Sequence, residues 1–146
     1  MFADFLKRLT APAPAPLSDT DARLALTALL VRIARADGDY APAEIERIDR
    51  IVASRYGLSP FEATALRKEA ETLETEAPDT VRFTRAIKDA VAHEERIGVI
   101  ESLWQVVLAD GERDAEEDAI VRLAANLLGI NDRDSALARQ RVTGQS

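Results

Sequence analysis

The sequence predicts an all-α protein of one domain, and three observations support that prediction. Apolar residues recur at the spacing of a helix face from residue 18 to residue 141. Four of the six glycines, Gly38, Gly57, Gly111 and Gly129, fall where such helices would end or be connected. No segment shows the strict alternation of apolar and polar residues that is typical of a half-buried strand.

Composition excludes several classes of function. The chain has 146 residues, 47% of them hydrophobic and 31% charged, as expected for one globular domain. It has no cysteine, which excludes disulfides, thiolate zinc sites and a cysteine nucleophile. Its one histidine, His93, cannot alone form a multi-histidine metal site or most Ser-His arrangements. A net charge of −7 has the wrong sign for binding phosphate backbones, so we expect no nucleic-acid partner.

The N-terminal region differs from the rest of the chain. Residues 1–10 carry a short apolar stripe at helical spacing, and residues 11–16 alternate Ala and Pro, which favours a polyproline II spacer. We expect a short helix and spacer over 1–16, a helical domain over 17–141, and a frayed tail over 142–146. The stripe is interpreted as a weakly docked or fraying helix, with a membrane or partner contact as the alternative.

Membrane insertion and secretion are not expected. No run approaches the ~18 consecutive apolar residues of a membrane-spanning helix. The N-terminus lacks the basic and then apolar order of a signal peptide. We therefore expect no transmembrane segment and a cytoplasmic location.

The first half of the domain contains three predicted helices, over residues 18–36, 42–56 and 59–74. Ser18 is a candidate N-cap for the first of them. Pro42 can begin the second, because the first position of a helix needs no N–H donor. Gly57 followed by an apolar residue predicts a Schellman ending. A capping box from Ser59 to Glu62 opens the third helix.

The second half contains four predicted helices, over residues 80–92, 97–108, 114–128 and 131–141. The segment 97–108 is the most apolar, and we expect it to be the central helix. Asp114 and Glu117 form a capping box, and Asn131 caps the last helix. Gly98 should mark a close approach of two helices, because glycine within a helix costs about 1 kcal/mol relative to alanine. The residues predicted to be buried are Leu30, Ile33, Ile48, Ile51, Ile100, Leu103, Trp104, Val107, Ile120 and Leu127.

The two halves resemble each other. The run Ala36-Asp37-Gly38-Asp39 matches Ala109-Asp110-Gly111-Glu112 at a shift of 73 residues, and Glu44 matches Glu117 at the same shift. Beyond these helices, Gly57-Leu58-Ser59 matches Gly129-Ile130-Asn131 at a shift of 72. A duplicated helix-loop-helix unit explains this agreement.

This unit resembles the tellurite-resistance protein TerB family and its TerB-like relatives over roughly residues 20–141. The resemblance implies a compact single-domain helical bundle of about seven or eight helices, with no enzymatic activity. It also implies an acidic patch that is proposed for the family to chelate a metal ion. The motif positions here are Asp37, Gly38, Asp39 and Glu44, then Asp110, Gly111, Glu112 and Glu117.

The acidic members of this motif are the candidate metal ligands. They are Asp37, Asp39, Glu44, Asp110, Glu112 and Glu117. Carboxylates without nitrogen or sulfur ligands suit calcium, magnesium or manganese. The loops do not have the glycine position of an EF-hand, so we expect weak binding, with a dissociation constant on the order of 10⁻⁴ to 10⁻³ M. The alternative is that these residues only cap helices and turns, with Gly38 and Gly111 at positive φ.

Other residues are interpreted as structural. The acidic run Glu69, Glu71, Glu74, Glu76 and Asp79 is expected to be a solvated face. Trp104 is expected in the core, and His93 at the surface or packed at the start of a helix. Tyr40, beside the first acidic loop, could cover the loop or contact a partner.

The function expected from the sequence is that of a non-enzymatic, TerB-like acidic helical module. It would bind a divalent cation, a protein partner, or both, in a bacterial stress or tellurite-resistance context. The alternative is a pure protein-interaction domain without metal, of the kind associated with co-chaperones. A metal-dependent hydrolase is disfavoured, because no histidine is available for general-base work. Neither the partner nor the oligomeric state follows from the sequence.

Overall fold

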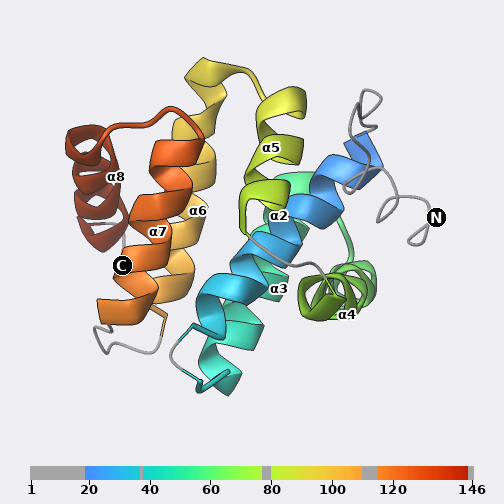
Figure 1. Cartoon of the computed structure of the whole chain (residues 1–146). Helices are drawn as coiled ribbons and strands as arrows, with labels where there is room; N and C mark the ends of the chain where they lie inside the picture. Colours follow the sequence, from blue (N-terminus) through green and yellow to red (C-terminus); the bar gives the residue numbers. More distant parts are fainter. Residues whose placement is uncertain (1–18, 37, 77–79, 110–114, 145–146) are drawn as a thin grey trace.

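The computed structural model of the chain describes residues 19–36, 38–76, 80–109 and 115–144. Within these ranges it has seven α-helices, one 3-10 helix and no strand, which confirms the all-α helical bundle. In chain order they are α2 Asp19–Ala34, α3 Pro42–Tyr56, α4 Pro60–Glu76, α5 Thr80–Ala90, η1 His93–Glu95, α6 Arg96–Val107, α7 Ala115–Leu127 and α8 Asp132–Gly144 (Figure 1). The short helix predicted within residues 1–16 lies outside the described residues, as does the candidate cap Ser18.

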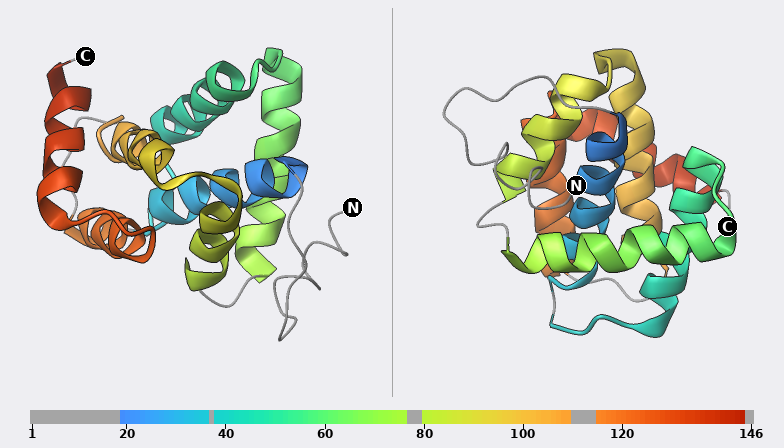
Figure 2. Two further views of the ribbon diagram at one scale, coloured as in Figure 1. Left: turned by 90° about the horizontal axis from the view of Figure 1, so that it is seen from above. Right: turned by 90° about the vertical axis from the view of Figure 1, so that its right-hand side faces the viewer.

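The central helix is α2, and not the segment 97–108 as predicted. It packs against α3, α4, α5, α6 and α7, and α4 crosses it in the right-hand view of Figure 2. From Leu24 to Ala34 every residue except Arg32 is buried. A helix that is apolar on all sides must be enclosed by others, whereas one apolar face can be buried by a few neighbours.

The apolar helix α6 joins the centre to the edge of the bundle. It packs against α2 and α3 on one side and against α7 and α8 on the other. The last helix, α8, lies at the edge in Figure 1 and in the left-hand view of Figure 2, and it contacts α6 and α7. It continues to Gly144, beyond the domain boundary predicted at residue 141, and Val142 within it is buried.

The predicted core is confirmed except on α7. There, Ile120 and Leu127 are only half-buried, and Leu123 is 49% exposed. The buried residues of α7 that the structure describes are Glu117, Val121, Ala124 and Ala125, and Leu128 just after the helix is buried as well. The helix is therefore rotated from the predicted face, so that Val121, Ala124 and Ala125 are more deeply buried than Ile120 and Leu127.

Both helix-loop-helix units end in the predicted way. After α3, Gly57 adopts φ 64°, and the Leu58 N–H donates to the Ala53 carbonyl over 3.0 Å. After α7, Gly129 adopts φ 81°, and the Ile130 N–H donates to the Ala125 carbonyl over 2.8 Å. These are the bonds of Schellman endings, in which a left-handed residue returns the chain toward the last turn. The superposition of the two complete units stays a prediction.

The predicted N-caps of α4 and α8 are also present. The Ser59 Oγ accepts the Glu62 N–H over 3.1 Å, and the Glu62 carboxylate accepts the Ser59 N–H over 2.9 Å. These hydrogen bonds lower the pKa of Glu62 from its ordinary value. At the start of α8, the Asn131 Oδ1 accepts the Asp134 N–H over 2.8 Å.

The predicted close approach at Gly98 is wrong. A β-carbon placed there would meet the Arg55 Nη1 at 3.8 Å, which is ordinary contact with the end of a flexible side chain. The space beside Gly98 is therefore open enough for a methyl group. Among the described helices, none has both the length and the apolar character needed to cross a membrane.

Candidate functional site

The first acidic loop connects α2 to α3. Gly38 adopts φ 82°, as predicted, and its N–H donates to the Arg35 carbonyl over 3.0 Å. The Asp39 side chain is exposed, and its carbonyl accepts the Ala41 N–H over 3.0 Å. The candidate ligand Asp37 lies outside the described residues. The described part of the loop is therefore a tight turn that presents one carboxylate to solvent.

Glu44 caps the start of α3 from within the protein. It is the third residue of the helix and is fully buried. Its Oε1 accepts the Ala41 N–H over 3.1 Å, which is the carboxylate half of a capping box. Ala41 has no side-chain oxygen to complete the box, so the carboxylate is the side-chain cap. An acceptor oxygen is also favoured at this position by the helix dipole.

Glu117 occupies the same place in the second unit. It is the third residue of α7, and its exposed fraction is 2%. Figure 1 shows the end of α2, the start of α3, the end of α6 and the start of α7 at the same end of the bundle. The fold therefore brings the two buried glutamates to the same end of the molecule.

The predicted metal ligands are only partly described. Asp37, Asp110 and Glu112 lie outside the described residues, as does Gly111. Among the residues that the structure does describe, no group of three or more His, Asp or Glu side chains is placed to hold a metal ion. The complete ligand set, and its selectivity for calcium, magnesium or manganese, stay predictions.

The combination of these features matches one protein family. A family model described as tellurite resistance protein TerB matches residues 23–140. The chain belongs to the TerB family. Comparison with curated proteins and with solved structures gives no significant match.

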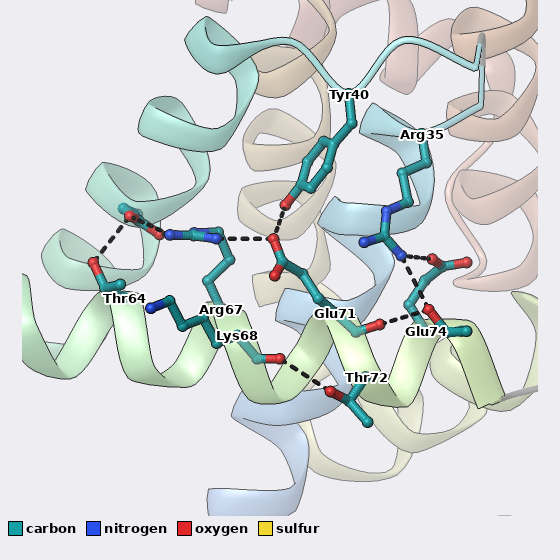
Figure 3. A network of polar contacts seen from close by, with 10 residues as sticks. Arg35, Tyr40, Thr64, Arg67, Lys68, Glu71, Thr72 and Glu74 are labelled. Atoms are coloured by element: carbon teal, nitrogen blue, oxygen red, sulfur yellow. Dashed lines mark hydrogen bonds and ion pairs between the residues drawn. The ribbon is translucent and has the colours of Figure 1, made fainter.

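In this TerB-family chain, the first acidic loop is tied to α4 by Tyr40. The Tyr40 hydroxyl donates to the Glu71 Oε2 over 2.7 Å, and the Arg35 guanidinium lies 4.9 Å from the centre of the Tyr40 ring (Figure 3). Burial and the hydrogen bond to Glu71 raise the pKa of Tyr40 well above its ordinary value. Tyr40 therefore contacts residues of its own domain and ties the loop to α4, and a partner contact stays a prediction.

The same carboxylate, Glu71, is part of an ion-pair network between α3 and α4. Arg67 donates to Glu71 over 2.8 Å and to Asp49 over 2.6 and 3.3 Å. Thr64 also donates to Asp49, over 3.1 Å. Burial lowers the pKa of Arg67, but the hydrogen bonds to the two carboxylates outweigh it and raise the pKa above its ordinary value. The network holds α3 and α4 together on the side where the loop is attached.

A second group of ion pairs joins α2 to the end of α4. The Glu74 carboxylate accepts hydrogen bonds from Arg32 over 3.1 Å and from Arg35 over 2.7 Å. The predicted solvated face is therefore wrong for Glu71 and Glu74, which are partly buried and paired. It is correct for the exposed Glu69 and Glu76, whereas Asp79 lies outside the described residues. The spacing of Arg67 and Glu71, four residues apart on one helix, is the sequence signal that could have predicted their ion pair.

Trp104 is confirmed as a core residue. It is 3% exposed, and its indole N–H donates to the Ser135 carbonyl over 3.1 Å and to the Ser135 hydroxyl over 3.2 Å. These bonds attach α8 to α6. His93 is exposed at the start of η1, as predicted.

Proposed function

We propose that this TerB-family chain is a non-enzymatic module that binds a divalent cation through the carboxylates of its two Asp-Gly loops. The proposal extends to a bacterial stress or tellurite-resistance context, of which the family's description names tellurite resistance. Because the chain has no cysteine, such a role would not involve reduction of tellurite by a thiol of this chain.

The observation that carries the proposal is the presence of a buried glutamate in the first turn of the helix after each acidic loop. Glu44 caps the start of α3, and Glu117 is buried in the first turn of α7 at the same end of the bundle. Asp39 presents an exposed carboxylate beside the first of these starts. Oxygen ligands on a rigid support, in a chain of net charge −7, suit a hard cation.

The network around Tyr40 supports the same proposal. A loop that binds an ion must otherwise lose conformational freedom when the ion arrives, and this loss opposes binding. The hydrogen bond from Tyr40 to Glu71 anchors the loop to α4 in the absence of an ion. The first loop is therefore better prepared for a ligand than an untethered turn.

The alternative is a TerB module that contacts a protein partner without metal. One observation favours it: Phe61, in the first turn of α4, is 83% exposed. Exposed aromatic side chains are common anchors in protein interfaces. This alternative predicts that divalent cations leave the folded protein unchanged.

Thermal melting with calcium or manganese, at fixed ionic strength, tests the cation proposal. Binding to the folded state alone would stabilise it by about 2.7 kcal/mol when the ion is at about 100 times its dissociation constant. The double variant Asp37→Asn, Asp110→Asn should lose this increase in melting temperature. It should still fold, because asparagine replaces aspartate well in caps and turns.

The matched control removes two charges elsewhere. Glu69 and Glu76 are exposed on α4 and are not among the paired carboxylates. The double variant Glu69→Gln, Glu76→Gln should keep the full ion-dependent increase. An equal loss in both double variants would mean that the ion acts through general charge screening, and would reject the proposed site.

A further inference from the structure

A cleft of about 620 Å³ lies between α7 and α8. Trp104 contributes to its lining, together with Ser135. Two arginines, Arg122 and Arg139, also line it. A concave space of this size lies within the range of small-molecule sites, roughly 300–1,000 Å³.

These arginines can be compared with the residues at the same helix positions in the first half of the chain. Arg67 is the eighth residue of α4, and Arg139 is the eighth residue of α8. Arg67 makes three hydrogen bonds to carboxylates, two to Asp49 and one to Glu71. In the first unit, all three guanidinium nitrogens of the arginine at this position therefore donate to carboxylates.

The corresponding carboxylates are missing from the second unit. Asp49 is the eighth residue of α3, and the eighth residue of α7 is Arg122. Glu71 is the twelfth residue of α4, and the twelfth residue of α8 is Thr143. Two acidic partners are thus replaced by an arginine and a threonine.

Arg139 is instead held against an aromatic ring. Its guanidinium carbon lies 5.2 Å from the centre of the Trp104 ring. Among the described residues, no carboxylate forms an ion pair with it. A guanidinium stacked on a ring still offers its edge donors, which match the two oxygens of a carboxylate.

Two carboxylates near the arginines of the cleft would repel a bound anion. Asp132 lies 3.5 Å from Arg122, and both side chains are more than half exposed. Such a long, exposed pair contributes about 0–1 kcal/mol, so an incoming carboxylate can compete for Arg122. Asp118 also lines the cleft, and its carboxylate disfavours a ligand of high negative charge.

We propose that the cleft between α7 and α8 binds a small molecule with a carboxylate group, held by Arg139 on the Trp104 ring and by Arg122. The ligand's carboxylate would take the place that Asp49 holds beside Arg67. This proposal goes beyond cation binding, and of the candidate cation ligands that the structure describes, Asp39, Glu44 and Glu117, none lines the cleft.

Fluorescence of Trp104 gives a direct test, because the chain has one tryptophan. The probe is glutarate, a small dicarboxylate, added at fixed ionic strength. We expect a saturable change for the wild type and none for glutaramide, which has the same shape without the charge. Arg139→Gln should weaken glutarate binding by about tenfold or more, as expected for the loss of a charged hydrogen bond.

A second variant tests the comparison between the two units. Arg122→Asp places a carboxylate where the first unit has Asp49, so it should pair with Arg139, raise the melting temperature and abolish the glutarate response. Arg85→Gln, an exposed arginine of α5 outside the cleft, should bind glutarate like the wild type. The proposal is overturned by an unsaturable wild-type response, by unchanged binding in both cleft variants, or by inorganic phosphate binding as tightly as glutarate.

Discussion

The Tyr40 hydroxyl and the Glu71 carboxylate are 31 residues apart in sequence and 2.7 Å apart in space. Their hydrogen bond joins the first acidic loop to the middle of α4 (Figure 3). Glu71 also pairs with Arg67, so the loop is connected through one carboxylate to the ion pairs between α3 and α4. The position of the loop therefore depends on a network outside it.

The first prediction concerns the strength of this connection. Tyr40→Phe removes the hydroxyl and leaves the ring, and we expect it to lower the free energy of unfolding by about 1–2 kcal/mol. Urea denaturation measures this change. In a double-mutant cycle with Glu71→Gln, the two losses should be smaller together than their sum. Additive losses would show that the hydrogen bond contributes nothing measurable.

The second prediction concerns alkaline pH. The pKa of Tyr40 is raised above its ordinary value of 10.0, so the fold favours the protonated phenol. This contribution is complete below pH 10 and is lost as the pH rises toward the folded pKa. Stability of the wild type should therefore fall above pH 10, and it should fall less steeply in Tyr40→Phe.

Tyr56 sets a background for that measurement. Burial raises its pKa as well, although Arg55 and Arg23 act in the opposite direction. The alkaline loss should therefore be reduced in Tyr40→Phe but not abolished. The measurement is the denaturation midpoint of both proteins across this pH range. If the midpoint falls equally steeply with pH in the wild type and in Tyr40→Phe, Tyr40 makes no contribution and the prediction is contradicted.

A third prediction is that Gly98→Ala stabilises the protein by about 0.5–1 kcal/mol. Alanine is the better helix former, and the open space beside Gly98 accepts its methyl group. Gly129→Ala is the opposite control, because φ 81° is unfavourable for alanine and should cost about 1–2 kcal/mol. Differential scanning calorimetry distinguishes the two. Destabilisation by Gly98→Ala would reveal a packing constraint at this position.

The fourth prediction tests the core. Leu103 is fully buried in α6, and Leu103→Ala should cost about 2–5 kcal/mol. Leu123 of α7 is 49% exposed, so Leu123→Ala should change stability by no more than about 0.5 kcal/mol. Chemical denaturation of both variants checks the rotated face of α7. A similar loss of stability in Leu103→Ala and Leu123→Ala would contradict the exposed position of Leu123.

Features determined by neighbouring residues could be predicted from the sequence. The left-handed Gly57 and Gly129, the capping box of Ser59 and the Asn131 cap each depend on a few consecutive residues. Their chemistry is local, so the pattern alone identifies them. The all-α class follows from the same signals.

Features that depend on how helices meet could not be predicted in the same way. The acidic residues of α4 look alike in sequence, yet Glu71 accepts a hydrogen bond from Tyr40 of the first loop and Glu74 pairs with Arg32 of α2, while Glu69 faces solvent. Which apolar face of α7 is buried also depends on its neighbours. The central place of α2 was visible in its nearly uninterrupted apolar residues, but segment 97–108 has a similar composition.

Calorimetric titration of the folded protein with calcium tests whether the Asp-Gly loops bind a cation. We expect a saturable heat for the wild type that a chelator removes, and no saturable heat for the double variant Asp37→Asn, Asp110→Asn. A wild-type protein that gives only the heat of dilution, with calcium and again with manganese, would contradict the claim that the Asp-Gly loops bind a cation.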